Sequence, residues 1–320
     1  MIVGCALGGG FAFLGIKGFP AVRPEITVAP EKLIEEPIIE NFLGLGPFYL
    51  VNTLPTLFVT IFLVIIPLAW ATRNSLRKSA RTDLVPGGVG NLMEAILEML
   101  YNLTEGSAGA KYARMIFPWF ATIMIYVLIA NLLKLVPGFE SIGVLHEAHG
   151  HTGHHIAQLA GHWYLFTPEE GEYILAPFFR GISVDLNFTA SLALISVVMI
   201  QVIGLRAQKL SYFSKFFNTR RMFKVPFFGA MDFLVGLLEL ISELSKILSF
   251  AFSLFGNMFA GIVLVALVAS MLGFVSILPA MIMMFELFVG VIQAFVFGML
   301  TMVFMAQATQ GHGEEHAEAH

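Results

Sequence analysis

The sequence predicts an all-α integral membrane protein, and three observations lead to that fold class. Of its 320 residues, 57% are hydrophobic and only 12% are charged, whereas soluble domains carry about 25% charged residues. Several apolar segments are long enough to cross a hydrocarbon core of about 30 Å. The last two are unusually long. We therefore expect three or four spans followed by a strongly tilted C-terminal helical hairpin, residues 226–310.

The N-terminal part, residues 1–48, combines an apolar segment with a linker. Residues 1–19 are interrupted by glycines and are compatible with a membrane segment or with an uncleaved signal-like anchor. Four prolines within residues 20–46 predict an extramembrane linker. The single cysteine, Cys5, excludes a disulfide framework.

Residues 49–225 are predicted to hold three spans and a surface helix. The first span, residues 49–72, is followed by a basic cluster that begins at Arg73. Residues 90–103 have apolar positions at helical spacing with carboxylates opposite, which predicts a helix lying along the membrane surface. Residues 115–136 and 186–205 are the second and third spans.

Two basic segments, residues 73–82 and 206–224, predict the topology. Lysine and arginine close to spans favour the cytoplasmic side, so we expect these segments and the polar tail, residues 311–320, in the cytoplasm. The loop 137–184 would then be external. Beside membrane spans, such clusters are topology signals rather than sites for nucleic acid. No transit peptide is evident, which favours the bacterial plasma membrane.

The hairpin is predicted from helix length. If residues 226–271 form one helix, their 46 positions extend about 69 Å, whereas an upright helix crosses with about 20 residues. Such a helix must tilt strongly in the bilayer. Residues 273–279 can turn the chain, and residues 280–307 give a second long apolar helix.

A face of small residues runs along the first hairpin helix. Its members recur at helical spacing: Ser242, Ser245, Ser249, Ser253, Gly256 and Ala260. One edge of this face carries polar side chains: Glu239, Glu243, Lys246 and Asn257. Small residues allow close helix packing in lipid, and ionisable groups near an apolar span mark ion paths. A packing face and an ion path are therefore both open.

Glu286 is the candidate proton carrier of the second hairpin helix. Residues 247–285 contain no charged side chain. Gln293 follows Glu286 two turns later, on the same face of the helix. An isolated carboxylate in a membrane helix is a functional hypothesis by default, although a structural hydrogen-bonded pair is the alternative. Asp185, at the start of the third span, serves equally as a cap or as a functional group. Asn131 and Lys134 end the second span, where the lysine is expected to reach the interface.

The nine histidines fall in the external loop and in the tail. Their spacing could hold a metal ion, but a solvated loop is the simpler interpretation, and we expect no metal site. Neither a phosphate-binding loop nor a nucleotide motif is evident, so we expect no cofactor and no catalytic site in this chain.

The stretch 243–261, ELSKILSFAFSLFGNMFAG, resembles subunit a of the F-type ATP synthases. The resemblance continues in other parts of the chain, in the family's order: Phe117-Pro118, Asn131-Leu132-Leu133, Arg180, Ser183-Val184-Asp185-Leu186-Asn187 and Gln293-Ala294-Phe295. It implies a non-catalytic, proton-translocating subunit with two aqueous half-channels beside a c-ring. The implied partners are the c-ring, the peripheral-stalk subunit b, the rest of the synthase and membrane lipid.

The resemblance also implies roles for single residues. Glu286 and Asn131 match positions of the proton entry path. Gln293 matches the glutamine that faces the family's essential arginine, and Asn257 matches a polar residue near the ring. Glu239 and Ser249 match positions of the cytoplasmic exit.

Two departures from the family pattern bear on function. Family members carry the essential arginine directly before Leu-Phe-Gly-Asn, and this chain has Ser253 there. Ile262 stands where an acidic or histidine partner is expected. Lys246 lies about 10 Å from position 253 along the helix, and we do not expect it to substitute for the missing arginine. The chain could be an inactive paralogue, an arginine-to-serine variant, or a stator whose charge another chain supplies. The alternative functions are a degenerate stator or scaffold and a metal-ion transporter served by the histidine loop.

Overall fold

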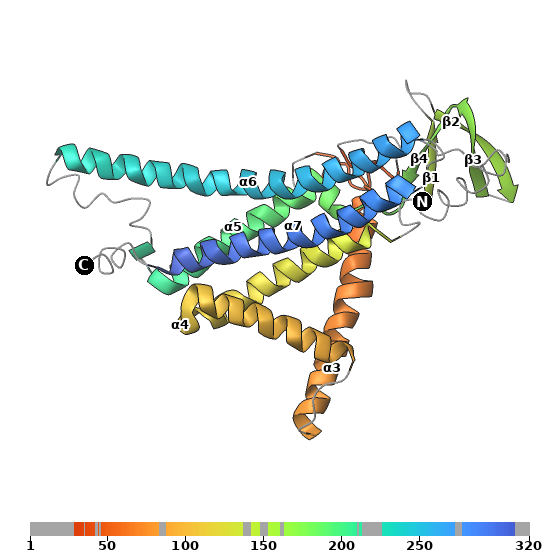
Figure 1. Cartoon of the computed structure of the whole chain (residues 1–320). Helices are drawn as coiled ribbons and strands as arrows, with labels where there is room; N and C mark the ends of the chain where they lie inside the picture. The colour runs from red at the N-terminus through yellow and green to blue at the C-terminus, as the bar shows by residue number, and fades with distance from the viewer. Residues whose placement is uncertain are drawn as a thin grey trace. The chain divides into compact units, whose positions relative to one another are not determined.

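The computed structural model confirms a mostly helical membrane protein (Figure 1). It describes residues 29–34, 36–41, 44, 46–82, 88–136, 142–147, 153–160, 163–209, 211–212, 226–272 and 277–310. Five helices among them are long and apolar enough to cross a membrane. Three precede the hairpin and two form it. The apolar segment predicted within residues 1–19 lies outside the described residues.

The first span is a single helical rod with a local change of helix type. It comprises α2 (Thr53–Phe58), the π-helix η1 (Val59–Ile65) and α3 (Ile66–Thr82). Pro67 has no N–H to donate to the preceding turn, and the wider π-helix ends just before it. The sequence placed the end of the apolar span before Arg73. The helix itself continues for nearly three more turns, because its arginines and lysine are good helix formers.

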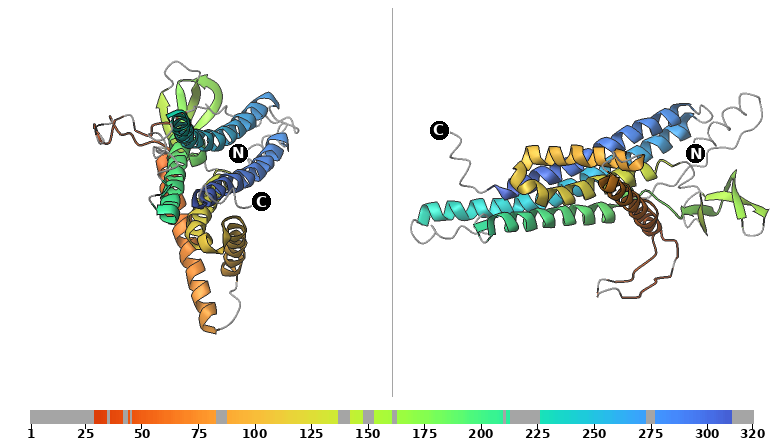
Figure 2. Two further views of the ribbon diagram at one scale, coloured as in Figure 1. Left: turned by 90° about the vertical axis from the view of Figure 1, so that its left-hand side faces the viewer. Right: turned by 90° about the horizontal axis from the view of Figure 1, so that it is seen from below.

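Helix α4 (Val89–Leu133) contains both the expected surface helix and the second span. The two parts are separated at Gly109, whose φ of 73° and ψ of 156° are not helical. A positive φ of this kind costs glycine little. The rings of Tyr101 and Phe117, each eight positions from Gly109, lie 5.3 Å apart. The chain therefore turns back on itself here, as Figures 1 and 2 show for α4.

A small antiparallel sheet lies within the predicted external loop, and the sequence analysis did not predict it. The sheet contains β1 (Gly143–Glu147), β2 (Gly153–Ala160), β3 (Trp163–Gly171) and β4 (Tyr173–Pro177), in the order β1-β4-β2-β3. His146 pairs with Ile174 and His154 with Tyr173. Much of the remaining histidine cluster, including the tail histidines, lies outside the described residues.

After the sheet, the 3₁₀-helix η2 (Ile182–Val184) leads into α5 (Leu186–Gln208), close to the predicted third span. The hairpin follows as α6 (Pro226–Leu272) and α7 (Ile277–Thr309). Both long helices are confirmed. The 47 residues of α6 extend about 70 Å. Backbone groups have no partners in lipid, so an unbroken apolar sequence of this length has to form a helix.

The chain forms two compact units, each built from three separate segments. The first unit contains Met1–Val64, Leu128–Leu186 and Phe255–Ile292, and the second contains Ile65–Val127, Asn187–Leu254 and Gln293–His320. In the second unit, Gly298 of α7 lies against α4. A Cβ atom at Gly298 would be 3.2 Å from the Phe120 ring, so a small residue is needed for this contact.

Candidate functional site

In the second unit a cleft of about 500 Å³ lies between α6 and α7. Its walls carry four serine hydroxyls, one lysine, one glutamine and apolar side chains: Ser242, Ser245, Lys246, Ser249, Phe250, Ser253, Gln293, Val296, Phe297, Leu300 and Phe304. The helical spacing of the serines places them along one wall of the cleft. Four serines of the small face predicted on α6 therefore also form one wall of this cleft.

Ser249, Ser253 and Gln293, to which the sequence analysis gave positions in the family pattern, come together in this cleft. Ser249 and Ser253 are exposed on α6, whereas the Gln293 side chain of α7 is buried. The centroid of the Phe250 ring lies 5.2 Å from that of Phe297 and 5.8 Å from that of Phe304. Aromatic packing thus holds α6 against α7 beside the polar wall.

Lys246 supplies the charge of this cleft. Among the described residues that line it, Lys246 is the only charged side chain. Its Nζ atom lies 2.9 Å from Glu243 Oε1, one turn earlier on α6. The same atom lies 4.6 Å from the centroid of the Phe304 ring, a distance suited to a cation–π contact.

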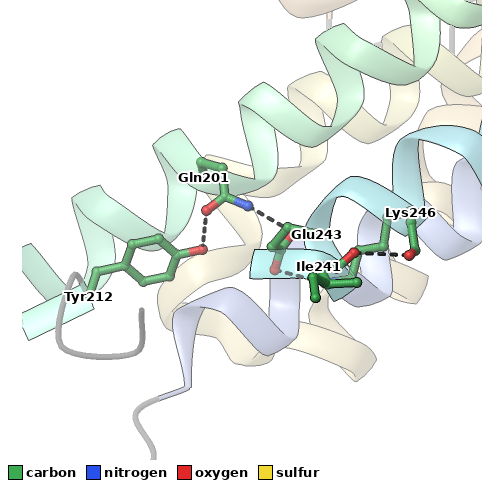
Figure 3. Close-up of polar contacts among 6 residues, drawn as sticks. Gln201, Tyr212, Ile241, Glu243 and Lys246 are labelled. Carbon is green, nitrogen blue, oxygen red and sulfur yellow. Dashed lines mark hydrogen bonds and ion pairs between the residues drawn. The ribbon is translucent and has the colours of Figure 1, made fainter. Parts of the chain in front are cut away.

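A chain of hydrogen bonds extends from this ion pair to α5 and beyond (Figure 3). Gln201 Nε2 donates to Glu243 Oε2 over 2.8 Å. The Tyr212 hydroxyl donates to Gln201 Oε1 over 2.7 Å. Glu243 is buried, and both of its oxygens are occupied. The network therefore fixes the position of Lys246 at the cleft.

The ionisation of the Tyr212 phenol tests this network. Burial, then the nearby carboxylates Glu243 and Glu239, raise the pKa of its phenol to about 12, because both disfavour the phenolate. The unfolded chain would release this proton near pH 10, so the contribution of Tyr212 to stability is complete below pH 10. It is lost as the pH rises through 12.

We expect the difference in ultraviolet absorbance between the wild type and Tyr212→Phe, followed as the pH is raised, to show one tyrosine that ionises at about pH 12. A tyrosinate titration of the two proteins in detergent measures it. A difference curve centred near pH 10 would mean that Tyr212 is exposed and that the network is absent.

In the first unit, the carboxylate of Glu286 lies beside the end of α4. Glu286 Oε2 is 3.4 Å from Lys134 Nζ, and both side chains are buried. Asn131 Nδ2 donates to the carbonyl of Gly290 over 3.0 Å. Two predicted path residues, Glu286 and Asn131, are thus buried at the contact of α4 with α7.

Asp185 is buried in the same unit, directly before α5. Its Oδ2 accepts a 2.8 Å hydrogen bond from Thr53 of α2, and the Arg180 N–H donates to Thr56 over 3.0 Å. These contacts attach the segment before α5 to the first span. Of the other predicted site residues, Glu239 is half-buried and Asn257 is exposed, both on α6.

The model of the ATP synthase A chain family matches residues 54–306. The chain belongs to this family. Its relatives include ATP synthase subunit a of Mycobacterium bovis, which is 30% identical over 79% of this chain and 85% of its own length. The subunit a of Legionella pneumophila is 28% identical over 82% of this chain and 87% of its own. The subunit a of Moorella thermoacetica is 26% identical over 84% of this chain and 95% of its own length.

Membership of the ATP synthase A chain family agrees with the helical architecture and with a non-catalytic membrane subunit. Three polar residues of this member were not recognised as site residues in the sequence: Lys134, Gln201 and Tyr212. Lys134 was expected at the interface, but it is buried against Glu286. Gln201 offered one signal, a single amide within an apolar span, where polar groups are costly without a partner.

Proposed function

We propose that this chain is the membrane proton-translocating subunit of a rotary ATP synthase and provides two aqueous half-channels beside a c-ring. The observation that carries the proposal is the cleft between α6 and α7, where an ammonium group, hydroxyls and an amide lie among apolar side chains. Ionisable and polar side chains are costly within an apolar helical bundle and are typical of ion paths. Family membership supplies the class of complex.

The proposed path assigns one role to each polar cluster. Glu286, Asn131 and Asp185 belong to the entry side, where their burial beside other polar groups suits a narrow aqueous path. Glu239 and Ser249 belong to the cytoplasmic exit. Gln293 faces position 253, and Asn257 lies near the ring.

The proposed surroundings follow from the same assignment. The partners are the c-ring, the peripheral-stalk subunit b and membrane lipid, in a bacterial plasma membrane. Many apolar side chains of α6 are exposed, Leu238 and Leu248 among them, which suits contact with lipid or with an apolar ring. The basic segments 73–82 and 206–224 and the tail 311–320 would lie in the cytoplasm.

A second candidate is a degenerate stator that occupies the same place without coupling proton flow to rotation. Ser253 favours it, because a hydroxyl cannot supply the fixed positive charge that the family resemblance assigns to this position. Ile262, where the resemblance implies an acidic or histidine partner, points the same way. In this reading the chain would assemble with its complex but conduct few protons.

We expect Glu286→Gln to lower proton flux about tenfold or more, which corresponds to about 1.4 kcal/mol in the barrier. The amide keeps the size of the side chain but cannot take up and release a proton. Flux is measured in vesicles that contain the whole reconstituted complex.

Glu105→Gln is the matched control, since Glu105 is exposed on α4, and its flux should equal that of the wild type. A Glu286→Gln complex that conducts normally would contradict the channel function. A wild-type complex that assembles but does not conduct would favour the degenerate stator.

A further inference from the structure

Two segments of the first unit lie against the Glu286 carboxylate. Lys134 follows the last turn of α4, and its ammonium lies 3.4 Å from Glu286 Oε2. The two side chains are 3% and 9% exposed. On α6, a Cβ atom at Gly261 would lie closest to Glu286 Oε1 and would be 3.0 Å from Glu286 Cδ. The carboxylate therefore occupies space that exists only because residue 261 has no side chain.

The lysine is held as closely as the carboxylate. A Cβ atom at Gly181 would lie 3.1 Å from Lys134 Cβ, so the segment before η2 packs on the stem of Lys134. One turn before Lys134, Asn131 bonds the carbonyl of Gly290, one turn after Glu286. Two successive turns of α4 thus contact two successive turns of α7. These contacts fix Oε2 as the carboxylate oxygen that faces the Lys134 ammonium.

The two oxygens of Glu286 have different surroundings. Oε2 faces Lys134, whereas Oε1 is buried and has no hydrogen-bond donor among the residues that the structure describes. Asn131 Oδ1 is buried without a donor in the same described set. Buried acceptors in proteins almost always have a protein or water donor. Two such oxygens at one helix contact indicate a place where water meets protein.

We propose that Lys134 is a positioning residue for Glu286: it holds Oε2 and leaves Oε1 as the oxygen that exchanges protons with water in the entry path. This inference rests on the proposed function. In the uptake step a hydronium ion loses one proton, Oε1 gains it, and a neutral water molecule remains. Lys134 keeps its charge throughout and compensates the carboxylate, which would otherwise be an unpaired buried ion.

The test compares four variants of the whole complex in vesicles: Lys134→Met, Lys134→Arg, Glu286→Gln and the exchange K134E/E286K. Proton flux is expressed per assembled complex, with assembly measured by copurification. We expect Lys134→Met to lose about tenfold or more in flux and Lys134→Arg to regain most of it. The exchange variant should assemble but should not regain flux, because it moves the carboxylate from α7 to the end of α4.

Lys111→Met is the matched control, since Lys111 is exposed on α4, and it should conduct normally. Normal flux in Lys134→Met would overturn the inference, and so would full flux in the exchange variant, because the pair would then be only structural. Should Lys134→Met fail to assemble, the Lys134→Arg and exchange variants decide. Normal flux in Glu286→Gln contradicts the proposed function itself. An impaired Glu286→Gln beside a normal Lys134→Met contradicts only the role of Lys134.

Discussion

Replacing Ser253 by arginine should raise proton-driven ATP synthesis about tenfold or more, equivalent to about 1.4 kcal/mol in the limiting barrier. Ser253 is exposed on the wall of the cleft of about 500 Å³, with Gln293 among the residues that line it. The cleft has room for a guanidinium group. A fixed cation here would favour the ionised form of a partner carboxylate and would repel protons that pass directly between two half-channels. Synthesis is measured in reconstituted vesicles under an imposed proton gradient.

The control separates position from charge. Ser245 lines the same cleft and donates its hydroxyl to the carbonyl of Ile241 over 2.9 Å. Ser245→Arg therefore adds the same charge about 12 Å earlier along α6, and it should leave synthesis low. Strong synthesis by the wild type with no gain in Ser253→Arg would refute the idea that the serine weakens coupling. An equal gain in both variants would mean that the added positive charge acts whatever its position in the cleft.

The hairpin could be predicted from the sequence almost to the residue. Its first helix was expected over residues 226–271 and is observed as Pro226–Leu272. The reason is physical: an apolar sequence in lipid satisfies its backbone only within a helix, so composition and length suffice. The serine spacing on α6 likewise follows from helical periodicity alone.

The sheet and the bend could not be predicted in this way. Strands β1 to β4 lie in a polar, histidine-rich stretch without a clear alternation of apolar and polar residues, and the pairing of β1 with β4 joins positions that are far apart in sequence. The reversal at Gly109 depends on one positive φ value inside an otherwise continuous helical pattern. Turns of this kind depend on tertiary contacts such as that of Tyr101 with Phe117.

The sequence drew attention to single polar residues but not to their contacts. Glu286 and Gln293 stood out because polar side chains are rare in these spans, and Ser249 stood out as a member of the face of small residues. The partners of the buried groups are distant in sequence: Lys134 is 152 positions from Glu286, and Gln201 is 42 positions from Glu243. Periodicity within one helix cannot show which face of another helix lies opposite. Lys134 was therefore assigned to the interface, although it is buried in an ion pair.

Glu243→Leu should lower the free energy of unfolding by about 3 kcal/mol, the cost typical of breaking a buried ion pair. Glu243 accepts hydrogen bonds from Gln201 and Lys246, and its side chain is only 7% exposed. Leucine would leave the Lys246 ammonium, itself 17% exposed, without its carboxylate. Unfolding of the purified chain in mixed detergent micelles measures the change. Glu105→Leu makes the same substitution at an exposed position of α4 and should cost less than about 0.5 kcal/mol.

A double variant distinguishes the ion pair from simple loss of packing. Replacing both members of a buried pair by apolar side chains is often close to neutral, so Glu243→Leu combined with Lys246→Met should recover most of the lost stability. The coupling between the two sites is the recovered free energy. If the double variant is as unstable as Glu243→Leu, the carboxylate acts through Gln201 and Tyr212 instead, and the cleft would hold its lysine without help from Glu243.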